Sequence, residues 1–276
     1  MEKTAIIVAG GSGKRLGTAT PKQFLEINGF PVLFYSIEAF LQADSSLKII
    51  VVLPETLLDE WSRRIASRFT EANLDFTSGG SERFLSVLKG LSKTPNDCLV
   101  AIHDAARPLI TPTFINRLFQ EAEIHGCAIP AIHPTETVRL NYSWAHLSST
   151  EEREIHVSGF QSGSQNKKKQ PTLVLYPRDQ VFLIQTPQVF HRSTLLQSYE
   201  KIIPEIYQSK GFRVPDSLNI EEIARKFTDD AAIWESAGHP LYLVPGEIYN
   251  LKITRKEDLL FAEFLLKILK KREPGN

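Results

Sequence analysis

Short apolar runs alternate with segments of helical periodicity along the first half of the chain, and this alternation constrains the fold more than any other feature. The apolar runs lie at 5–9, 47–54, 74–80, 98–108 and 127–134. The segments between them carry apolar residues at helical spacing, at 31–40, 55–69, 81–91 and 112–126. Apolar strands separated by helices are typical of a parallel sheet that is covered on both sides. We therefore predict an α/β fold, with a Rossmann-like, mostly parallel twisted sheet and helices on both faces.

The alternation breaks between about 135 and 185. There, strand-like pieces at 155–157 and 173–176 lie on either side of the polar tract QSGSQNKKKQP. This segment predicts a protruding β-arm at about 135–182 with a loop at its tip. Beyond the arm, the pattern predicts helices at 192–207, 228–237 and 255–271 and a strand at 241–246. We expect residues 1–276 to form a single domain that carries this arm.

Charge and composition exclude several classes of protein. The 276 residues contain 32 Lys and Arg against 32 Asp and Glu, so the formal net charge is zero. Balanced charge gives no support to a nucleic-acid or membrane partner, and neither is expected. No apolar run reaches the roughly 18 residues of a membrane span, and no signal peptide precedes the first strand, so we expect a cytoplasmic location. Cys98 and Cys127 lack metal-ligand spacing and are expected to be buried free thiols.

The loop after the first predicted strand, AGGSGKRLGTATPK at 9–22, combines glycines with the cations Lys14, Arg15 and Lys22. Arg15 stands where the Walker A pattern needs a hydroxyl, and Leu16 stands where the dinucleotide-binding fingerprint needs its third glycine. The loop therefore matches neither motif. Glycines still let backbone N–H groups approach an oxyanion closely, and the cations add charge. The loop favours a polyphosphate ligand; a solvated turn with scattered surface cations is the alternative.

Six ordered blocks carry a resemblance to a known family. They read AGGSGKRLGTATPKQFLEINGFPVL, GGSERFLSVLKGL, HDAARPLI, QTPQVF, FTDDAAIWE and YNLKITRKEDLLFAE. In order and spacing they resemble the 2-C-methyl-D-erythritol 4-phosphate cytidylyltransferases, a family of sugar-phosphate nucleotidyltransferases, over about 5–265 apart from 141–172. The resemblance implies a nucleotidyltransferase domain that transfers CMP from CTP to methylerythritol phosphate and releases pyrophosphate in non-mevalonate isoprenoid biosynthesis. It also implies in-line attack of the substrate phosphate on the α-phosphorus of CTP, with Mg²⁺ as the divalent cation.

By this resemblance, the first two blocks bind CTP. Arg15 and Lys22 would be catalytic cations that flank the triphosphate. The other CTP contacts would come from small residues and backbone, at Ala9, Gly10, Gly11, Gly13, Gly80 and Ser86. Arg83 would lie near the cytosine, and plain helix capping remains open as the role of Ser81 and Glu82.

Asp104 ends a predicted buried strand in the block HDAARP, so we expect it at the edge of the sheet where ligands bind. The resemblance places Asp104 and Arg107 in the substrate site. A carboxylate beside a triphosphate is also a candidate Mg²⁺ ligand. A structural salt bridge between Asp104 and Arg107 is the alternative, and His103 is expected to be a packed histidine at the strand end.

The resemblance assigns the remaining substrate contacts to residues far apart in the chain. Arg178 and Lys252 would be catalytic cations that grip the phosphate of the sugar alcohol. Thr137, Thr186 and Thr228 would be substrate-binding residues. An exposed cation at a strand end is the alternative for Lys252.

The family's arm is exchanged between subunits, which implies a homodimer formed through the arm. In this chain the arm is longer than usual, with 145–172 extra or diverged. Glu136 and Arg139 stand where the family usually has Asp and Lys. The segment 209–225 is also longer than usual.

Three other functions remain open at this stage. A ribitol-5-phosphate cytidylyltransferase shares the glycine block, the Asp-Ala-x-Arg-Pro block and the Gln-Thr-Pro-Gln block. A nicotinamide-dependent oxidoreductase would use the same general fold, although the third fingerprint glycine and an acidic ribose ligand are missing. A non-catalytic nucleotide-binding protein would leave the cations of the glycine loop without a chemical role.

Overall fold

The computed structural model describes residues 1–11, 20–141, 173–208, 211–212, 215 and 218–270. It divides into two compact units, one formed by Met1–Pro130 with Gln185–Asn276 and the other by Ala131–Ile184. The predicted sites at Gly13, Lys14 and Arg15 and the arm tip at 145–172 lie outside the described residues.

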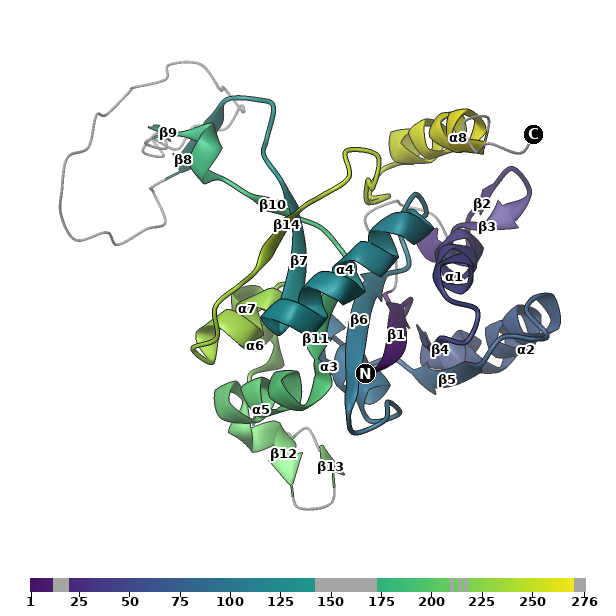
Figure 1. Cartoon of the computed structure of the whole chain (residues 1–276), viewed down its shortest axis with the longest axis horizontal. Helices are drawn as coiled ribbons and strands as arrows, with labels where there is room; N and C mark the ends of the chain where they lie inside the picture. The colour runs from purple at the N-terminus through teal and green to yellow at the C-terminus, as the bar shows by residue number, and fades with distance from the viewer. Residues whose placement is uncertain (12–19, 142–172, 209–210, 213–214, 216–217, 271–276) are drawn as a thin grey trace, which may run out of the picture. The chain divides into compact units, whose positions relative to one another are not determined.

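The first unit is built on a mixed, mostly parallel sheet with the strand order β7-β11-β6-β1-β4-β5, and β14 also pairs with β7. These strands are β1 Glu2–Val8, β4 Lys48–Leu53, β5 Leu74–Ser78, β6 Cys98–Asp104, β7 Cys127–Ile132, β11 Gln188–His191 and β14 Leu243–Pro245. Parallel pairing joins β1 to β4 and β6, and β4 to β5 (Figure 1). The predicted α/β fold class is confirmed.

Strand β11 is the part of the sheet that periodicity missed. It runs antiparallel between β6 and β7 and is hydrogen-bonded to both. Its four residues begin and end on polar side chains, so no alternation marks them as a strand. Gln188 is nevertheless 1% exposed, because its amide nitrogen donates to Asp229 and its amide oxygen accepts from the N–H of Ala231.

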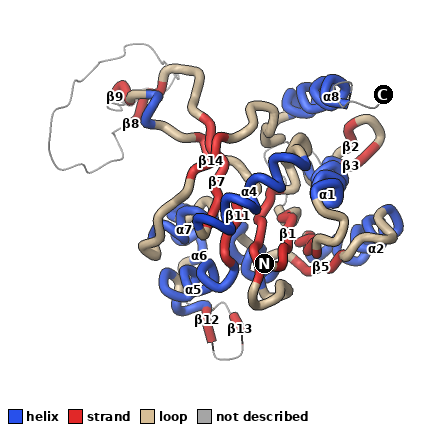
Figure 2. The backbone as a smooth tube through the Cα atoms, viewed as in Figure 1, coloured by secondary structure: helices blue, strands red, loops and turns tan. Residues whose placement is uncertain are grey.

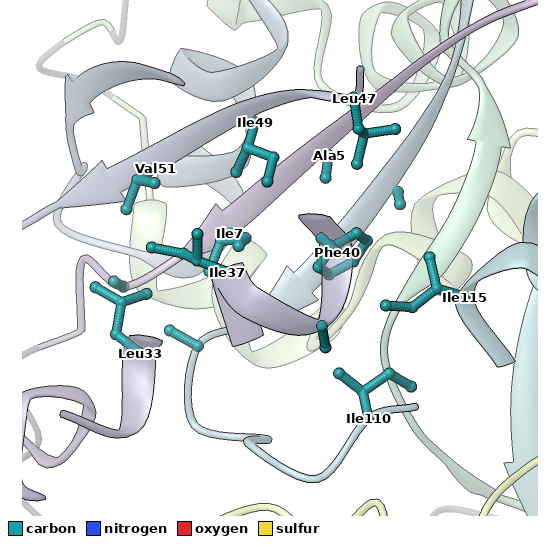
Figure 3. Close-up of a cluster of buried hydrophobic side chains, with 14 of the residues drawn as sticks. Ala5, Ile7, Leu33, Ile37, Phe40, Leu47, Ile49, Val51, Ile110 and Ile115 are labelled. Atoms are coloured by element: carbon teal, nitrogen blue, oxygen red, sulfur yellow. The ribbon is translucent and has the colours of Figure 1, made fainter. Parts of the chain in front are cut away.

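Helices cover both faces of this sheet, among them α1 (Val32–Ala43) on one face and α3 (Arg83–Leu91) on the other. Ala5 and Ile7 of β1 lie in register with Ile49 and Val51 of β4, and all four pack under helix α1 (Figure 3). The residues between them point the other way, where helix α3 packs so closely on β1 that a Cβ at Gly90 would lie 2.6 Å from Ile6. Strands that are apolar on both faces are thus buried on both faces, as the sequence predicted.

The helices follow the predicted segments closely. They are α1 Val32–Ala43, α2 Leu58–Arg68, α3 Arg83–Leu91, α4 Pro112–His125, α5 Arg192–Ile202, α6 Ile220–Lys226, α7 Asp230–Ser236 and α8 Lys256–Lys270. Helix α4 shows the local reasons for its bounds: Thr111 caps its start, Pro112 occupies its first position, and Gly126 ends it in the left-handed conformation at φ 85°. No helix in the described part of the chain has the length and apolar character to cross a membrane.

Two small antiparallel pairs complete the first unit. Strands β2 Glu26–Ile27 and β3 Phe30–Pro31 form a hairpin whose turn residues, Asn28 and Gly29, both have positive φ. Asn-Gly is a strong short-range hairpin signal, although helical and strand periodicity do not register it. Strands β12 Tyr207–Gln208 and β13 Gly211–Phe212 pair beyond α5, which ends before Pro204 instead of continuing to 207.

The second unit contains strands β8 Val138–Asn141 and β9 Leu173–Tyr176, paired antiparallel. Strand β10, Leu183–Ile184, pairs antiparallel with Ala131 and Ile132 at the end of β7. The described part of the segment predicted as an arm is therefore β-structured.

Candidate active site

A pocket of about 700 Å³ opens where the carboxyl ends of β1, β5 and β6 meet. Three loops form most of its wall: 9–11 after β1, 80–83 at the start of α3, and 104–106 after β6. The rest of the described lining is formed by Val8, Lys22, Gln23, Ser86 and Lys252. Lys252 comes from the long loop between β14 and α8, drawn in tan in Figure 2. The ligand edge expected from the parallel sheet is thus a real pocket.

The glycine loop is held by the residue after the Pro-Lys pair. Nε2 of Gln23 donates to the carbonyl oxygens of Ala9 at 2.5 Å and Gly11 at 2.8 Å. Nζ of Lys22 donates to the carbonyl of Ile253 at 2.7 Å, which ties this cation to the Lys252 loop. Gln23 was not among the predicted site residues, and its position beside Lys22 was the available signal.

Close packing explains the glycine at position 80. A Cβ there would lie 2.4 Å from Cβ of Leu85, so a side chain cannot enter without a shift. The N–H of Gly80 donates to Oγ of Ser86 at 3.0 Å, and this hydroxyl donates in turn to the carbonyl of Glu82. Glu82 is the N-cap of α3 but makes no side-chain capping hydrogen bond, so the plain capping interpretation is wrong for Glu82.

Four alternating charges form a chain that starts on the pocket wall with Lys252, Asp104 and Arg83 and ends behind it at Asp230. Oδ2 of Asp104 lies 2.6 Å from Nζ of Lys252, and its Oδ1 lies 3.2 Å from Nε of Arg83. Nη1 of Arg83 lies 2.7 Å from Oδ2 of Asp230, a carboxylate with 0% exposure. Oδ1 of Asp230 accepts from the hydroxyl of Tyr199 at 2.6 Å. Asp230 and Tyr199 were not predicted; the TDD block contained the first, and no sequence signal marked the second.

Electrostatics keep Asp104 and Arg83 ionised. Burial by itself would raise the pKa of Asp104, but Arg83 and Lys252 outweigh it and hold that pKa well below its usual range. Burial would likewise lower the pKa of Arg83, but the carboxylates of Asp230 and Asp104 raise it above its usual value. The pocket therefore presents a carboxylate flanked by cations at neutral pH.

A buried chain of hydrogen bonds supports the backbone of Asp104. Its N–H donates to Oγ1 of Thr186 at 3.0 Å, and that oxygen lies 3.3 Å from Nδ1 of His103. Nε2 of His103 faces the carbonyl of Arg107 at 3.1 Å. A carbonyl only accepts, so neutral His103 donates from Nε2 and accepts the Thr186 hydroxyl proton at Nδ1. His103 is 0% exposed, which confirms a packed histidine, and this burial lowers its pKa to about 4.

The remaining predicted residues lie in different places. Arg107 is buried and its Nη1 donates to the carbonyl of Asn250 at 2.6 Å, whereas the ion pairs described for Asp104 are with Arg83 and Lys252. Thr228 is exposed in the loop between α6 and α7. Thr137 and Arg178 belong to the second unit and are exposed; Nη1 of Arg178 donates to the carbonyl of Thr135 at 2.9 Å.

The wall offers limited means of holding a metal ion. In the described ranges, the pocket carboxylates are those of Glu82 and Asp104. No group of three or more His, Cys, Asp or Glu side chains in those ranges is placed to hold a metal. Mg²⁺ in nucleotide sites is commonly held by one or two carboxylates, with substrate phosphates and water as the other ligands. Asp104 fits that pattern as a single protein ligand.

Comparisons with known proteins agree on one family. A family model described as IspD, 2-C-methyl-D-erythritol 4-phosphate cytidylyltransferase, matches residues 3–159 and 168–268. The protein of that name from Bacteroides fragilis is 36% identical over 96% of this chain and 100% of its own length. Its counterpart from Clostridium beijerinckii is 31% identical over 96% and 98%.

Solved structures agree on the fold. The 4-diphosphocytidyl-2C-methyl-D-erythritol synthase from Anaerococcus prevotii has a TM-score of 0.69 at 23% identity, covering 96% of this chain and 98% of that one. The 2-C-methyl-D-erythritol 4-phosphate cytidylyltransferase from Thermus thermophilus has a TM-score of 0.64 at 24% identity, covering 97% and 100%.

Proposed function

Because the chain belongs to the 2-C-methyl-D-erythritol 4-phosphate cytidylyltransferase family, we infer that it is an enzyme that transfers a cytidylyl group from CTP to 2-C-methyl-D-erythritol 4-phosphate in isoprenoid precursor biosynthesis. The structural observation that supports this activity is the row of charges at the pocket wall. There, Lys252, Asp104 and Arg83 lie beside a glycine-lined loop. Two highly charged anions can approach each other only where cations reduce their repulsion.

The reaction needs no protein nucleophile. A phosphate oxygen of the sugar alcohol attacks the α-phosphorus of CTP and forms a new P–O bond. The bond from that phosphorus to the oxygen bridging to the β-phosphate breaks in line, and pyrophosphate leaves with the electron pair. Catalysis then consists of holding the two anions in line and stabilising the charge that develops on the α-phosphate oxygens.

We assign the protein's share of this work to the pocket wall. The backbone of 9–11 and Gly80 would hold CTP, Lys22 would neutralise the triphosphate, and Lys252 would orient the attacking phosphate. Asp104 supports Lys252 through their 2.6 Å ion pair. Arg15 would add a second cation from the glycine loop.

Mg²⁺ is part of this proposal. Asp104 and the triphosphate oxygens would hold it, and it would supply further neutralisation of charge on those oxygens. Arg107, Thr186 and Thr228 remain predicted substrate-binding residues. The buried hydrogen bonds of Thr186 support a role in holding Asp104 as well.

We also propose that the enzyme is a homodimer formed through the arm. Thr137 and Arg178 of one subunit would then contact the substrate phosphate bound by the other subunit. A cytoplasmic location belongs to the same proposal. Light scattering on the eluate of a size-exclusion column tests the dimer, and a fully active monomer at assay concentration contradicts it.

The direct test of the activity is pyrophosphate release from CTP in the presence of 2-C-methyl-D-erythritol 4-phosphate and Mg²⁺. We expect turnover with this acceptor and much slower release with ribitol 5-phosphate. Release that depends on ribitol 5-phosphate alone, or on neither acceptor, overturns the proposed substrate.

A further inference from the structure

Asp230 is a fully buried carboxylate that lies behind the pocket wall and takes no part in the roles assigned above. Its exposed fraction is 0%, and it belongs to helix α7. A buried charge is costly unless it is paired and hydrogen-bonded. Asp230 meets both conditions, with Nη1 of Arg83 at 2.7 Å on one oxygen and the hydroxyl of Tyr199 at 2.6 Å on the other.

Arg83 connects this buried carboxylate to the pocket. Its guanidinium bridges Asp230 behind the wall and Asp104 on the wall, where Asp104 in turn holds Nζ of Lys252. The contact to Asp230 is the shorter of the two, 2.7 Å against 3.2 Å. A planar guanidinium with a fixed fork of donors transmits orientation from one carboxylate to the other.

We propose that Asp230 and Tyr199 are positioning residues for cytidylyl transfer: they fix the guanidinium of Arg83, and through it they hold Asp104 and Lys252 in the arrangement that the reacting phosphates meet. The proposal rests on the proposed function and adds two residues to it. Helices α5 and α7, which carry Tyr199 and Asp230, pack against each other and thereby give the pair a rigid base.

The charges support a positioning role over a purely structural one. Asp230 partly neutralises Arg83, so Arg83 does not draw both oxygens of Asp104 to itself and one stays with Lys252. Without Asp230, the guanidinium is free to turn wholly onto Asp104 or into the phosphate site. Either movement disturbs the position of the reactive anions, and small misplacements reduce rate strongly.

A double-mutant cycle between Asp230 and Arg83 tests the proposal. The variants are Asp230→Asn, Arg83→Gln and both together, with kcat/KM and the thermal midpoint measured for each. We expect Asp230→Asn to lower kcat/KM at least tenfold in the wild-type background and to have no further effect in the Arg83→Gln background. Tyr199→Phe should behave in the same way with a smaller loss, about threefold, whereas Asp75→Asn, which breaks a surface ion pair with Lys93, should stay at the wild-type value.

The thermal midpoint keeps the test informative if one variant folds poorly. Arg83→Gln leaves the buried Asp230 without its cation, so we expect the double variant to melt at a higher temperature than Arg83→Gln. Wild-type kcat/KM in a folded Asp230→Asn variant overturns the proposal. The proposal is also overturned if Asp230→Asn lowers kcat/KM by the same factor in the wild-type and Arg83→Gln backgrounds. A folded double variant whose kcat/KM is tenfold below that of Arg83→Gln has the same consequence.

Failure of the proposed function is separable from failure of this inference. A wild-type enzyme without CTP-dependent pyrophosphate release defeats the former. The Kd for CTP is therefore measured for the same four proteins of the cycle. We expect the effects of the two substitutions on this Kd to be non-additive as well. Additive effects on Kd as well as on kcat/KM defeat the inference while leaving the activity intact.

Discussion

Nζ of Lys252 lies 2.6 Å from Oδ2 of Asp104, although 148 positions separate the two residues in the chain. Strand β6 places Asp104 at the edge of the sheet, and the loop before α8 returns to the same edge with Lys252. The N–H of Ile253 donates to the carbonyl of Ala106 at 2.8 Å, which holds that loop against the end of β6. The two lysines of the described pocket lining, Lys22 and Lys252, thus come from opposite ends of the chain.

Lys252→Met tests the value of this contact. The substitution keeps the aliphatic stem and removes the charge that we propose orients the attacking phosphate, so we expect kcat/KM to fall by about 10²–10³. Asp104 would keep its ion pair with Arg83 but lose the one with Lys252, so we also expect a modest fall in the thermal midpoint. Lys93→Met removes a lysine from a surface pair with Asp75 and serves as the control. Equal activity of the two variants would argue against a catalytic Lys252.

Lys22→Ala tests the cation of the glycine loop. We expect a folded protein with a loss of about 10²–10³ in kcat/KM, since Lys22 lines the pocket and is proposed to neutralise the triphosphate. Lys48→Ala is a close match, because Nζ of Lys48 also donates to a backbone carbonyl, that of Lys93 at 2.8 Å, outside the pocket. Circular dichroism and steady-state assays on both variants separate the lost charge from the lost hydrogen bond. Near-wild-type turnover by Lys22→Ala contradicts its role.

Gly80→Ala and Gly11→Ala test how strongly the close packing around Gly80 affects stability. A Cβ at Gly80 would lie 2.4 Å from Leu85, so we expect overpacking to cost about 1–3 kcal/mol of unfolding free energy. A Cβ at Gly11 meets none of the described residues within 4 Å, so the free energy of unfolding of Gly11→Ala should lie within about 0.5 kcal/mol of the wild-type value. Urea denaturation measures both values. A Gly80→Ala variant as stable as Gly11→Ala would show that the loop shifts at little cost.

His103 should make stability depend on pH. Burial lowers its pKa in the folded state to about 4, from an ordinary value of 6.5. Between about pH 6.5 and pH 4, His103 is therefore protonated in the unfolded chain but neutral in the folded protein. The free energy of unfolding falls as the pH drops through this range. The full effect is on the order of 3 kcal/mol. The urea midpoint of the wild type should fall as the pH drops through this range, and that of His103→Gln should fall less. Parallel plots of midpoint against pH for the two proteins would contradict the assignment.

The metal proposal predicts that Mg²⁺ binds together with CTP. EDTA should abolish turnover and added Mg²⁺ should restore it, while titration calorimetry without CTP should detect no tight Mg²⁺ site, because Asp104 is a single protein ligand. Asp104→Asn should raise the Mg²⁺ concentration required for half-maximal rate. Asp75→Asn is the control, and full activity of the wild type in EDTA would exclude the metal.

Local patterns predicted most of the fold. The strand ending at Asp104 and the helices that begin at Val32, Arg83 and Pro112 followed from periodicity, proline and glycine. The hairpin at Asn28 was missed although its Asn-Gly turn is a local signal. Strand β11 was missed because four residues with polar ends carry no alternation, and its antiparallel place in the sheet depends on β6 and β7 alone.

The sequence by itself determined the α/β class, the family and several of the charged residues that line the pocket, because periodicity, turn chemistry and ordered blocks are local properties of a chain. Only the tertiary structure decided which charges meet. Arg83 pairs with Asp230, which lies 147 positions away in the chain, and the hydroxyl of Tyr199 donates a hydrogen bond to the same carboxylate. Such pairs form only when separate helices dock on the sheet, because an ion pair depends on distance in space and on exclusion of water, and neither is written in the spacing of residues along the chain.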